Sequence, residues 1–89
     1  MLSTFNVANG EFSIGRDLKN DITINGFSVS RHHCLLKQEA GQFKLYDLYS
    51  YNKTFINDNL VTAQALKHAE QIKIGNSLFI FLSHEAADD

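Results

Sequence analysis

The stretch GFSVSRHHCLL, residues 26–36, places a serine, an arginine and two adjacent histidines directly before an apolar run. Three kinds of chemistry could use these residue types. Ser30 and His33 could act as a nucleophile and its general base. His32, His33 and Cys34 are all metal-ligating types. A serine beside an arginine could instead hold an anion through charge-assisted hydrogen bonds.

Catalysis and metal binding both require a convergence of side chains that this stretch does not supply. A serine nucleophile needs an oriented base and an oxyanion hole, and nothing around Ser30 resembles a nucleophile elbow. His32, His33 and Cys34 are consecutive, so in an extended segment their side chains alternate between faces and cannot ligate one ion. The sequence therefore predicts no catalytic residues, no metal ligands and no cofactor.

The anion-binding hypothesis gains support from two other segments. Arg16 follows an apolar segment that ends at Gly15, and Asn52 lies in a polar stretch between two further apolar segments. If each apolar segment is a strand, these residues lie at strand ends together with Ser30 and Arg31, and the loops of a β-sandwich cluster at its two ends. Arginine suits a phosphate because its guanidinium donates two parallel hydrogen bonds.

Short apolar segments separated by turn residues recur along the chain and predict strands. They are residues 3–7, 11–15, 21–24, 34–37, 42–48, 53–57, 70–75 and 77–82. Turn residues such as those at 39–41 and 75–76 separate them, so most neighbouring strands are expected to form hairpins. The predicted fold is all-β, an antiparallel β-sandwich of two packed sheets with its binding loops at one end.

Three segments carry more specific expectations. Residues 77–82 are apolar at nearly every position, which predicts a central strand covered on both faces. Residues 61–71 fit a helical period poorly and are expected to form an irregular connection with a short strand at best. Residues 1–83 are predicted to form a single domain, and residues 84–89 a flexible tail or the start of a linker.

Composition and charge limit the possible partners. The chain has 89 residues with eight Lys or Arg and ten Asp or Glu, and its net charge of −2 favours neither nucleic acid nor an anionic membrane. One cysteine cannot form an internal disulfide and favours a reducing compartment, so an intracellular, cytoplasmic location is expected. No apolar run is long enough to span a membrane. Because the chain as a whole is slightly acidic, any anion that it binds must be held by a local group of cations.

The order of these motifs resembles the forkhead-associated domain family. The resemblance rests on Gly15-Arg16, Ser30-Arg31-His32-His33 and Asn52, and it covers nearly the whole chain, residues 5–82. It implies an eleven-stranded β-sandwich that binds phosphothreonine in a protein partner, the product of a serine/threonine kinase. The chain would then be a non-catalytic signalling adaptor, monomeric or weakly self-associating.

The resemblance also implies a role for each residue that contacts the partner. Arg16 and Ser30 would bind the phosphate, with Arg31 as a second cation at the lip of the pocket. Asn52 would bond the peptide backbone next to the phosphothreonine through its side-chain amide.

Four neighbouring positions complete the expected site. Gly15 and His33 would support it, the glycine by allowing a backbone turn at the strand end and the imidazole by tying loops together. Tyr51 and Lys53 flank Asn52 where the family usually has a small hydroxyl residue and a glycine. Tyr51 could offer its phenol to the phosphate or cover the pocket with its ring. Lys53 could add a third cation, and a positive φ there would cost about 1 kcal/mol relative to glycine.

Two alternatives to phosphothreonine recognition stay open. The changes at Tyr51 and Lys53 favour a degenerate pocket in a phosphate-independent scaffold, which would contact a partner in a secretion or regulatory assembly, or a second copy of itself. A small hydrolase or metal-dependent enzyme is a third hypothesis, which stoichiometric zinc in the purified protein would support.

Overall fold

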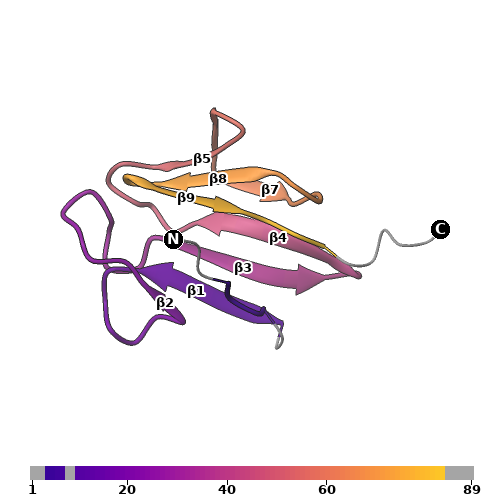
Figure 1. Cartoon of the computed structure of the whole chain (residues 1–89), viewed down its shortest axis with the longest axis horizontal. Coiled ribbons are helices and arrows are strands. Elements are labelled where there is room, and N and C mark those ends of the chain that lie inside the picture. The colour runs from indigo at the N-terminus through magenta and orange to yellow at the C-terminus, as the bar shows by residue number, and fades with distance from the viewer. Residues whose placement is uncertain (1–3, 8–9, 84–89) are drawn as a thin grey trace.

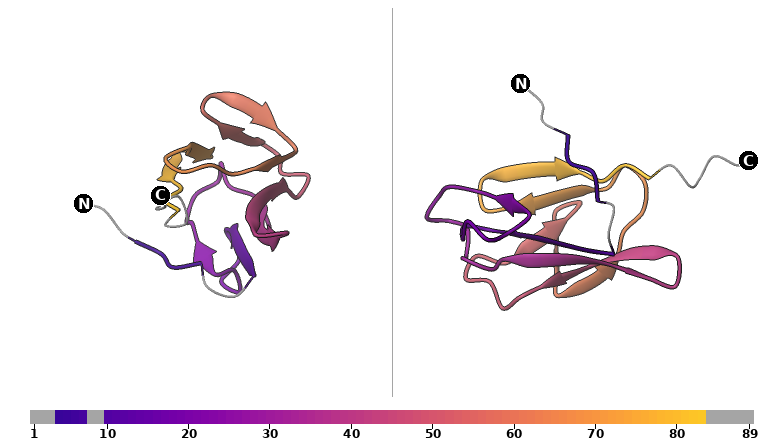
Figure 2. Two further views of the ribbon diagram at one scale, coloured as in Figure 1. Left: turned by 90° about the vertical axis from the view of Figure 1, so that its right-hand side faces the viewer. Right: turned by 90° about the horizontal axis from the view of Figure 1, so that it is seen from below.

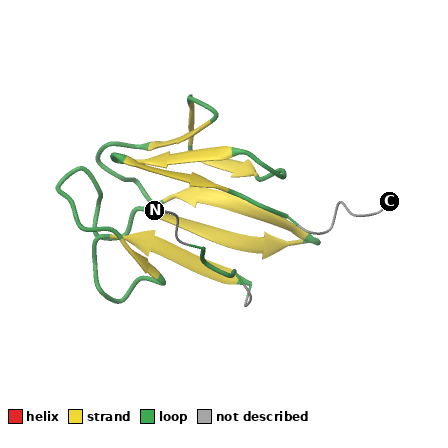
Figure 3. Cartoon of the chain, in the orientation of Figure 1, coloured by secondary structure: helices red, strands yellow, loops and turns green. Residues whose placement is uncertain are grey.

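Nine strands account for the regular structure of the described residues, 4–7 and 10–83, in the computed structural model (Figures 1 and 3). In chain order they are β1 (Glu11–Gly15), β2 (Ile22–Thr23), β3 (Cys34–Glu39), β4 (Gln42–Asp47), β5 (Thr54–Ile56), β6 (Asn59–Val61), β7 (Ala63–Ala65), β8 (Gln71–Ile74) and β9 (Ser77–Ile80). The predicted all-β fold is confirmed, with nine strands here where the family resemblance implied eleven.

The strands form two layers, which the views in Figure 2 separate. One sheet has the order β2-β1-β3-β4-β7, and the other has the order β6-β5-β8-β9. Paired strands are antiparallel, except that β2 runs parallel to β1. The parallel pair is short and involves only Ile14 and Gly15 of β1. The loop of residues 16–21 brings the chain back alongside these two residues so that β2 runs in the same direction as β1.

Two-residue turns close three hairpins and fix their register. Ala40 and Gly41 join β3 to β4, and both have positive φ, 51° and 81°. Asn57 and Asp58 join β5 to β6 with φ of 49° and 68°. Positive φ at both turn residues matches the right-handed twist of the flanking strands. Gly75, with a φ of 60°, and Asn76 join β8 to β9 as the third turn. The hairpins predicted at residues 39–41 and 75–76 are both present.

The hydrophobic core fills the space between the two sheets. Alternation along each strand sends every second side chain inward. The buried apolar side chains are Ile14, Ile22, Val29, Cys34, Leu36, Leu45, Ile56, Val61, Leu66, Ile72 and Ile74. Each fully buried leucine or isoleucine contributes about 1.5–3 kcal/mol, so this interior holds the layers at a fixed separation and gives the loops a rigid base.

Cys34 is part of this core, and its thiol is expected to be unreactive. Burial, together with the Asp47 carboxylate nearby, raises the pKa of its thiol to about 12. The thiol therefore stays protonated at neutral pH and is a poor nucleophile. Among residues 4–7 and 10–83, no group of three His, Cys, Asp or Glu side chains is arranged to hold a metal ion.

The prediction of a central strand over residues 77–82 is wrong. β9 lies at one edge of its sheet. Phe79 packs against the core, whereas Leu78 and Ile80 point to the opposite face and are 59% and 55% exposed. The apolar run therefore belongs to a half-buried edge strand, with aliphatic side chains at positions that are usually polar.

Residues 61–71 contain more regular structure than expected. β6 pairs with β5 in one sheet, and β7 pairs with β4 in the other. Thr62 lies between them, and its carbonyl accepts a hydrogen bond from the Asp47 backbone N–H at 2.9 Å. The chain thus passes from one sheet to the other within one residue. Three-residue strands are too short to show a clear alternating pattern in the sequence.

The N-terminal segment differs from the expected strand at residues 3–7. Residues 4–7 are not in a strand, Phe5 is half exposed, and Val7 packs against the core. One anchored side chain holds this segment without a hydrogen-bonded ladder. Residue 3 and the expected tail, residues 84–89, lie outside the described residues. In the described part of the chain, no helix has the length and hydropathy needed to cross a bilayer.

Candidate functional site

Three loops meet at one end of the sandwich, which we call the loop end (Figure 3). They are residues 16–21 between β1 and β2, residues 24–33 between β2 and β3, and residues 48–53 between β4 and β5. The Arg16 backbone N–H donates to the Ser30 carbonyl at 2.9 Å. The Tyr51 backbone N–H donates to the Ser30 hydroxyl, also at 2.9 Å. Ser30 therefore joins all three loops.

Arg16 is held by its side chain as well as by its backbone. Its Nε donates to the Val29 carbonyl at 3.0 Å. Within the described residues, the two terminal guanidinium nitrogens have no hydrogen-bond partner, and the residue is exposed. A guanidinium oriented in this way can donate two hydrogen bonds to an anion. Binding then costs less side-chain entropy, because the side chain is already partly fixed.

The Ser30 hydroxyl is able to donate a hydrogen bond. Its oxygen accepts the Tyr51 N–H, and a hydroxyl has one proton and two lone pairs, so the proton remains available. The main chains of Arg16 and Ser30 are hydrogen-bonded neighbours, so both side chains extend from adjacent backbone at the loop end.

An open hollow lies beside Arg16. Its lining residues are Arg16, Asp17, Leu18, Lys19 and Arg31. Three of them are cations, and Asp17 is the one carboxylate. The Asp17 Oδ1 accepts the Lys19 backbone N–H at 2.8 Å, which ties this carboxylate into its own loop. Lys19 is absent from the predicted site, because a single lysine in a polar loop carries no spacing signal.

Gly15 supports the loop end through close backbone contact. A Cβ at this position would lie 2.1 Å from the Arg31 carbonyl oxygen and 2.8 Å from Asn20 Nδ2. That carbonyl accepts hydrogen bonds from Asn20 Nδ2 at 2.7 Å and from the Asp17 N–H at 3.1 Å. The expected reason for glycine was a backbone turn, but Gly15 does not have positive φ. Glycine is required here by space.

His33 is fully buried, and both of its ring nitrogens bond to the backbone. Nδ1 accepts the Ser30 backbone N–H at 3.1 Å, so Nε2 carries the proton and donates to the Lys53 carbonyl at 2.9 Å. The imidazole therefore links the loop of Ser30 to the loop of Lys53. Since both nitrogens are already engaged, the ring is not placed to act as a general base for the Ser30 hydroxyl.

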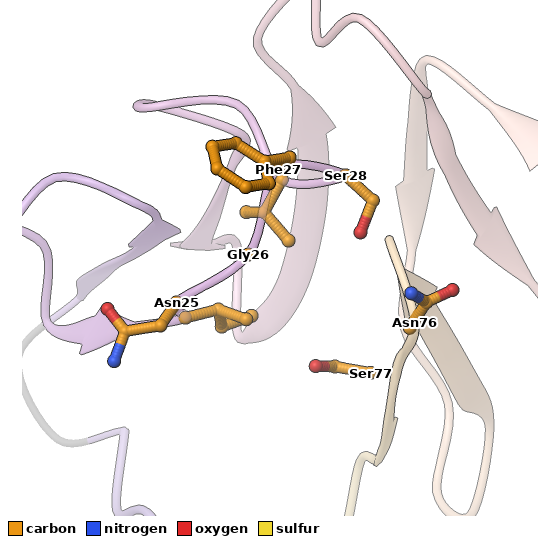
Figure 4. Close-up of a pocket in the computed structure, with 8 residues that line it drawn as sticks. Asn25, Gly26, Phe27, Ser28, Asn76 and Ser77 are labelled. Carbon is orange, nitrogen blue, oxygen red and sulfur yellow. The ribbon is translucent and has the colours of Figure 1, made fainter.

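Asn52 also connects two loops. Its Nδ2 donates to the Ser28 carbonyl at 3.0 Å, and the residue is exposed. The expected contact with a partner backbone stays a prediction, for which the amide oxygen is available. Ser28 borders a second hollow, where Figure 4 shows Phe27 and Ser28 across from Asn76 and Ser77.

Tyr51 and Lys53 both extend into solvent. The Tyr51 side chain is 87% exposed, so its ring does not fill the space between Arg16 and Ser30. Lys53 is exposed and has a φ of 71°. The backbone conformation favoured by glycine is therefore retained at position 53, although a lysine occupies it.

Replacing Lys53 with glycine is expected to stabilise the fold by about 1 kcal/mol, because glycine adopts positive φ without steric cost. The Lys53 carbonyl that bonds His33 is retained in this variant. Urea denaturation of the parent and of Lys53→Gly would measure the difference. Lys73→Gly, the same change in the middle of β8, is the control and is expected to destabilise. A Lys53→Gly protein no more stable than its parent would contradict the prediction.

A family model for the FHA (forkhead-associated) domain matches residues 12–75, from β1 to the turn before β9. The chain belongs to the FHA domain family. The match includes the whole loop end, and it confirms the resemblance inferred from the order of the motifs.

Two relatives of this FHA domain show where such a domain occurs. The glycogen accumulation regulator GarA of Mycolicibacterium smegmatis is 32% identical over 77 residues, which are 86% of this chain and 49% of GarA. The oxoglutarate dehydrogenase inhibitor of Corynebacterium efficiens is 33% identical over 73 residues, which are 82% of this chain and 51% of the inhibitor. The chain therefore spans about half the length of these relatives.

A solved structure shares the whole arrangement. It comes from a structural and functional analysis of phosphothreonine-dependent FHA domain interactions. Its TM-score is 0.87 at 28% sequence identity, and the alignment covers 92% of this chain and 85% of that one. The two-layer sandwich and its loop end are thus those of a known FHA domain.

Asp47 organises the third loop of this FHA domain, and sequence reasoning missed that role. Its Oδ1 accepts the Ser50 hydroxyl at 2.5 Å and the Thr54 hydroxyl at 2.7 Å, and its Oδ2 accepts the Ser50 backbone N–H at 3.0 Å. Burial opposes ionisation of the carboxyl, but the hydrogen bonds from Ser50 and Thr54, with His33 nearby, hold the pKa of Asp47 below its ordinary value. An aspartate three residues before a serine is a weak signal for such a loop.

Replacing Asp47 with asparagine is expected to cost about 1–3 kcal/mol of stability, because the buried Ser50 and Thr54 donors lose a charged acceptor. The lowered pKa means that the stabilisation is complete above the unfolded-state pKa, near 3.9, and is lost as pH falls through the folded-state pKa. Denaturation at pH 7 and at lower pH should show this acid-sensitive component in the parent and a smaller one in Asp47→Asn. Asp58→Asn, in an exposed turn, is the control. Equal acid sensitivity of both variants would refute the assignment.

Proposed function

We propose that this FHA domain is an intracellular, non-catalytic adaptor that binds phosphothreonine in a protein partner. The observation that carries the proposal is the pairing of Arg16 with Ser30. The Arg16 guanidinium is oriented through Nε with its terminal nitrogens available, and the Ser30 hydroxyl, held by the third loop, has a proton to donate. A phosphate near −2 accepts several such hydrogen bonds.

Each residue has a role in this proposal. Arg16 and Ser30 bind the phosphate, and Arg31 and Lys53 add positive charge at its edge. Asn52 bonds the partner backbone with its amide oxygen. Tyr51 positions the Ser30 hydroxyl through its backbone N–H, and its phenol lies at the rim of the site. Lys19, which lines the same hollow as Arg16 and Arg31, is a further cation.

The names of the relatives support a regulatory role. GarA is a regulator of glycogen accumulation, and the Corynebacterium protein is an inhibitor of oxoglutarate dehydrogenase. The solved FHA domain belongs to work on phosphothreonine-dependent interactions. We propose that residues 1–83 are the unit that docks a regulatory assembly onto a partner phosphorylated by a serine/threonine kinase.

Titration with matched peptides tests the proposal. A phosphothreonine peptide library and its unphosphorylated counterpart would be measured by calorimetry or fluorescence anisotropy. We expect dissociation constants on the order of micromolar for the best phosphopeptides, since a few charge-assisted bonds are offset by the cost of association. Unphosphorylated threonine leaves Arg16 and Ser30 without an acceptor and should bind far more weakly. Equal affinity for both peptide sets would refute the proposal.

Phosphate-independent contact is the second candidate function. The outer face of the four-stranded sheet carries exposed Leu60, Leu78 and Ile80, which is unusual for a solvent-facing sheet surface. A partner retained after phosphatase treatment and in Arg16→Ala, but lost in Leu78→Lys, would favour this candidate.

A further inference from the structure

The most exposed large hydrophobic side chains of the described residues all lie on the loop end. Leu18 is 85% exposed, Phe27 103%, Tyr49 100% and Tyr51 87%. Leu18 belongs to the first loop, Phe27 to the second, and the two tyrosines to the third. We call these four residues the apolar rim. Every other exposed large hydrophobic residue of the described chain is no more than 63% exposed.

The fold does not account for the apolar rim. Side chains with this much exposure bury almost no surface against the protein, so they add almost nothing to its hydrophobic stabilisation. Tyr49 also has a φ of 55°, a backbone conformation that glycine and asparagine adopt at lower steric cost than tyrosine. Four such exposed side chains at one end of the domain indicate a contact outside the chain.

The charges on the same loops indicate what kind of partner fits. The loop end holds four of the eight Lys and Arg residues, namely Arg16, Lys19, Arg31 and Lys53. Arg16, Lys19 and Arg31 line one hollow, and Leu18 lines it with them. One member of the rim, Leu18, therefore lies directly beside a cationic hollow. An anionic group with apolar surface around it complements this arrangement, in charge at the centre and in hydrophobicity at the edge.

We propose that the partner segment carries large apolar side chains on both sides of its phosphothreonine, and that these bury against the apolar rim. The inference rests on the proposed function and deepens it. Leu18 lines the hollow of Arg16, and Phe27 lines a separate hollow that Asn52 contacts through Ser28, so the rim offers apolar surface at two places around the site. Tyrosine, which supplies two of the four rim residues, is enriched among the few side chains that dominate an interface.

The second hollow gives one of these contacts a defined shape. Phe27 stands at its lip, with the apolar side chains of Ile24 and Val29 among its lining residues (Figure 4). Ser28, which joins this hollow to Asn52 by a hydrogen bond, links it to the loop that carries the tyrosines. An apolar side chain of the partner can therefore contact Phe27 while its backbone stays within reach of Asn52.

Two phosphothreonine peptides test the inference. One has leucine and phenylalanine at the two positions on each side of the phosphothreonine. The other has serine and asparagine there, with the same net charge. We expect the apolar peptide to bind at least about tenfold more tightly, as one large buried side chain contributes that much. Its binding should also show a more negative heat-capacity change.

Variants of the rim locate the effect. Leu18→Ser, Phe27→Ser and Tyr49→Asn, combined in one protein, should remove the preference for the apolar peptide and leave the affinity for the polar peptide within about twofold, since the Arg16 and Ser30 contacts remain. Asparagine is chosen at position 49 because it tolerates positive φ. Leu60→Ser and Leu78→Ser, exposed leucines on the far sheet face, are the matched controls and should keep the preference.

The possible results separate the two proposals. Equal affinity for both phosphopeptides overturns the inference, and so does a preference that survives in the triple rim variant. In either case the proposed function stands if unphosphorylated versions of the same peptides fail to bind. Failure of all phosphopeptides overturns both proposals. Loss of the preference in the rim variant alone, with both leucine controls unchanged, establishes the apolar rim as the surface that selects the partner.

Discussion

Arg16→Ala is expected to lower the affinity for a phosphothreonine peptide by at least about 100-fold, because two hydrogen bonds between charged groups are lost and each contributes about 1.5–3 kcal/mol. The fold should be little affected, since the residue is exposed and gives up one internal side-chain bond, from Nε to the Val29 carbonyl. Calorimetric titration, with circular dichroism to verify folding, would measure the effect.

The matched variants separate charge from geometry at this position. Arg16→Lys keeps the positive charge but loses the planar fork and the Nε anchor, so we expect it to recover only part of the affinity. Lys73→Ala removes a cation from a distant sheet face and should bind normally. Raising the salt concentration should lower the affinity of the parent protein for the phosphopeptide, because the exposed charges of the binding site are screened. A folded Arg16→Ala protein that binds within about twofold of the parent would end the phosphate-binding proposal.

Gly15→Ala is expected to destabilise the domain by about 3 kcal/mol or more. The new Cβ would meet the Arg31 carbonyl oxygen at 2.1 Å, so the backbone must move and the bonds that this carbonyl accepts from Asp17 and Asn20 are strained or lost. Overpacking costs about 1–3 kcal/mol, and each lost hydrogen bond about 1 kcal/mol. Thermal denaturation should show a melting temperature lower by about 12 °C or more.

Gly41→Ala provides the comparison for this effect. Gly41 has a φ of 81°, but a Cβ there meets no atom within 4 Å, so only the conformational cost of about 1 kcal/mol applies. If steric contact is what requires glycine at position 15, Gly15→Ala must be clearly the less stable variant. Equal losses in the two proteins would show that the contact between β1 and the Arg31 backbone relaxes easily.

The sequence predicts most of the sheet structure because strand alternation and turn chemistry are local. Hairpin turns at residues 40–41 and 75–76 follow from their residue types. Whether a strand is central or outermost depends on partners elsewhere in the chain, and that is why the apolar run of β9 was misleading. β6 and β7 have three residues each, and a pattern of period two needs more length than that to be recognised.

The loop end was also predictable only in part, because the sequence shows local residue patterns but not contacts between distant segments. Arg16, Ser30 and Asn52 could be singled out by residue type and by their place after apolar segments. The supporting side chains of Asn20 and Asp47 could not, since they act on backbone groups and on small hydroxyls that any polar loop contains. Geometry, not composition, distinguishes them from ordinary surface residues.

Three of the side-chain hydrogen bonds that connect the loops share one property. Arg16, Asn52 and His33 each donate a side-chain hydrogen bond to a main-chain carbonyl, at Val29, Ser28 and Lys53 respectively. A main-chain carbonyl accepts a hydrogen bond whatever side chain its residue carries. These three bonds therefore do not depend on the side chains of the residues that supply the acceptors. A combinatorial library over Leu18, Phe27 and Tyr49 could therefore retarget this module to new ligands while the central cradle keeps its shape.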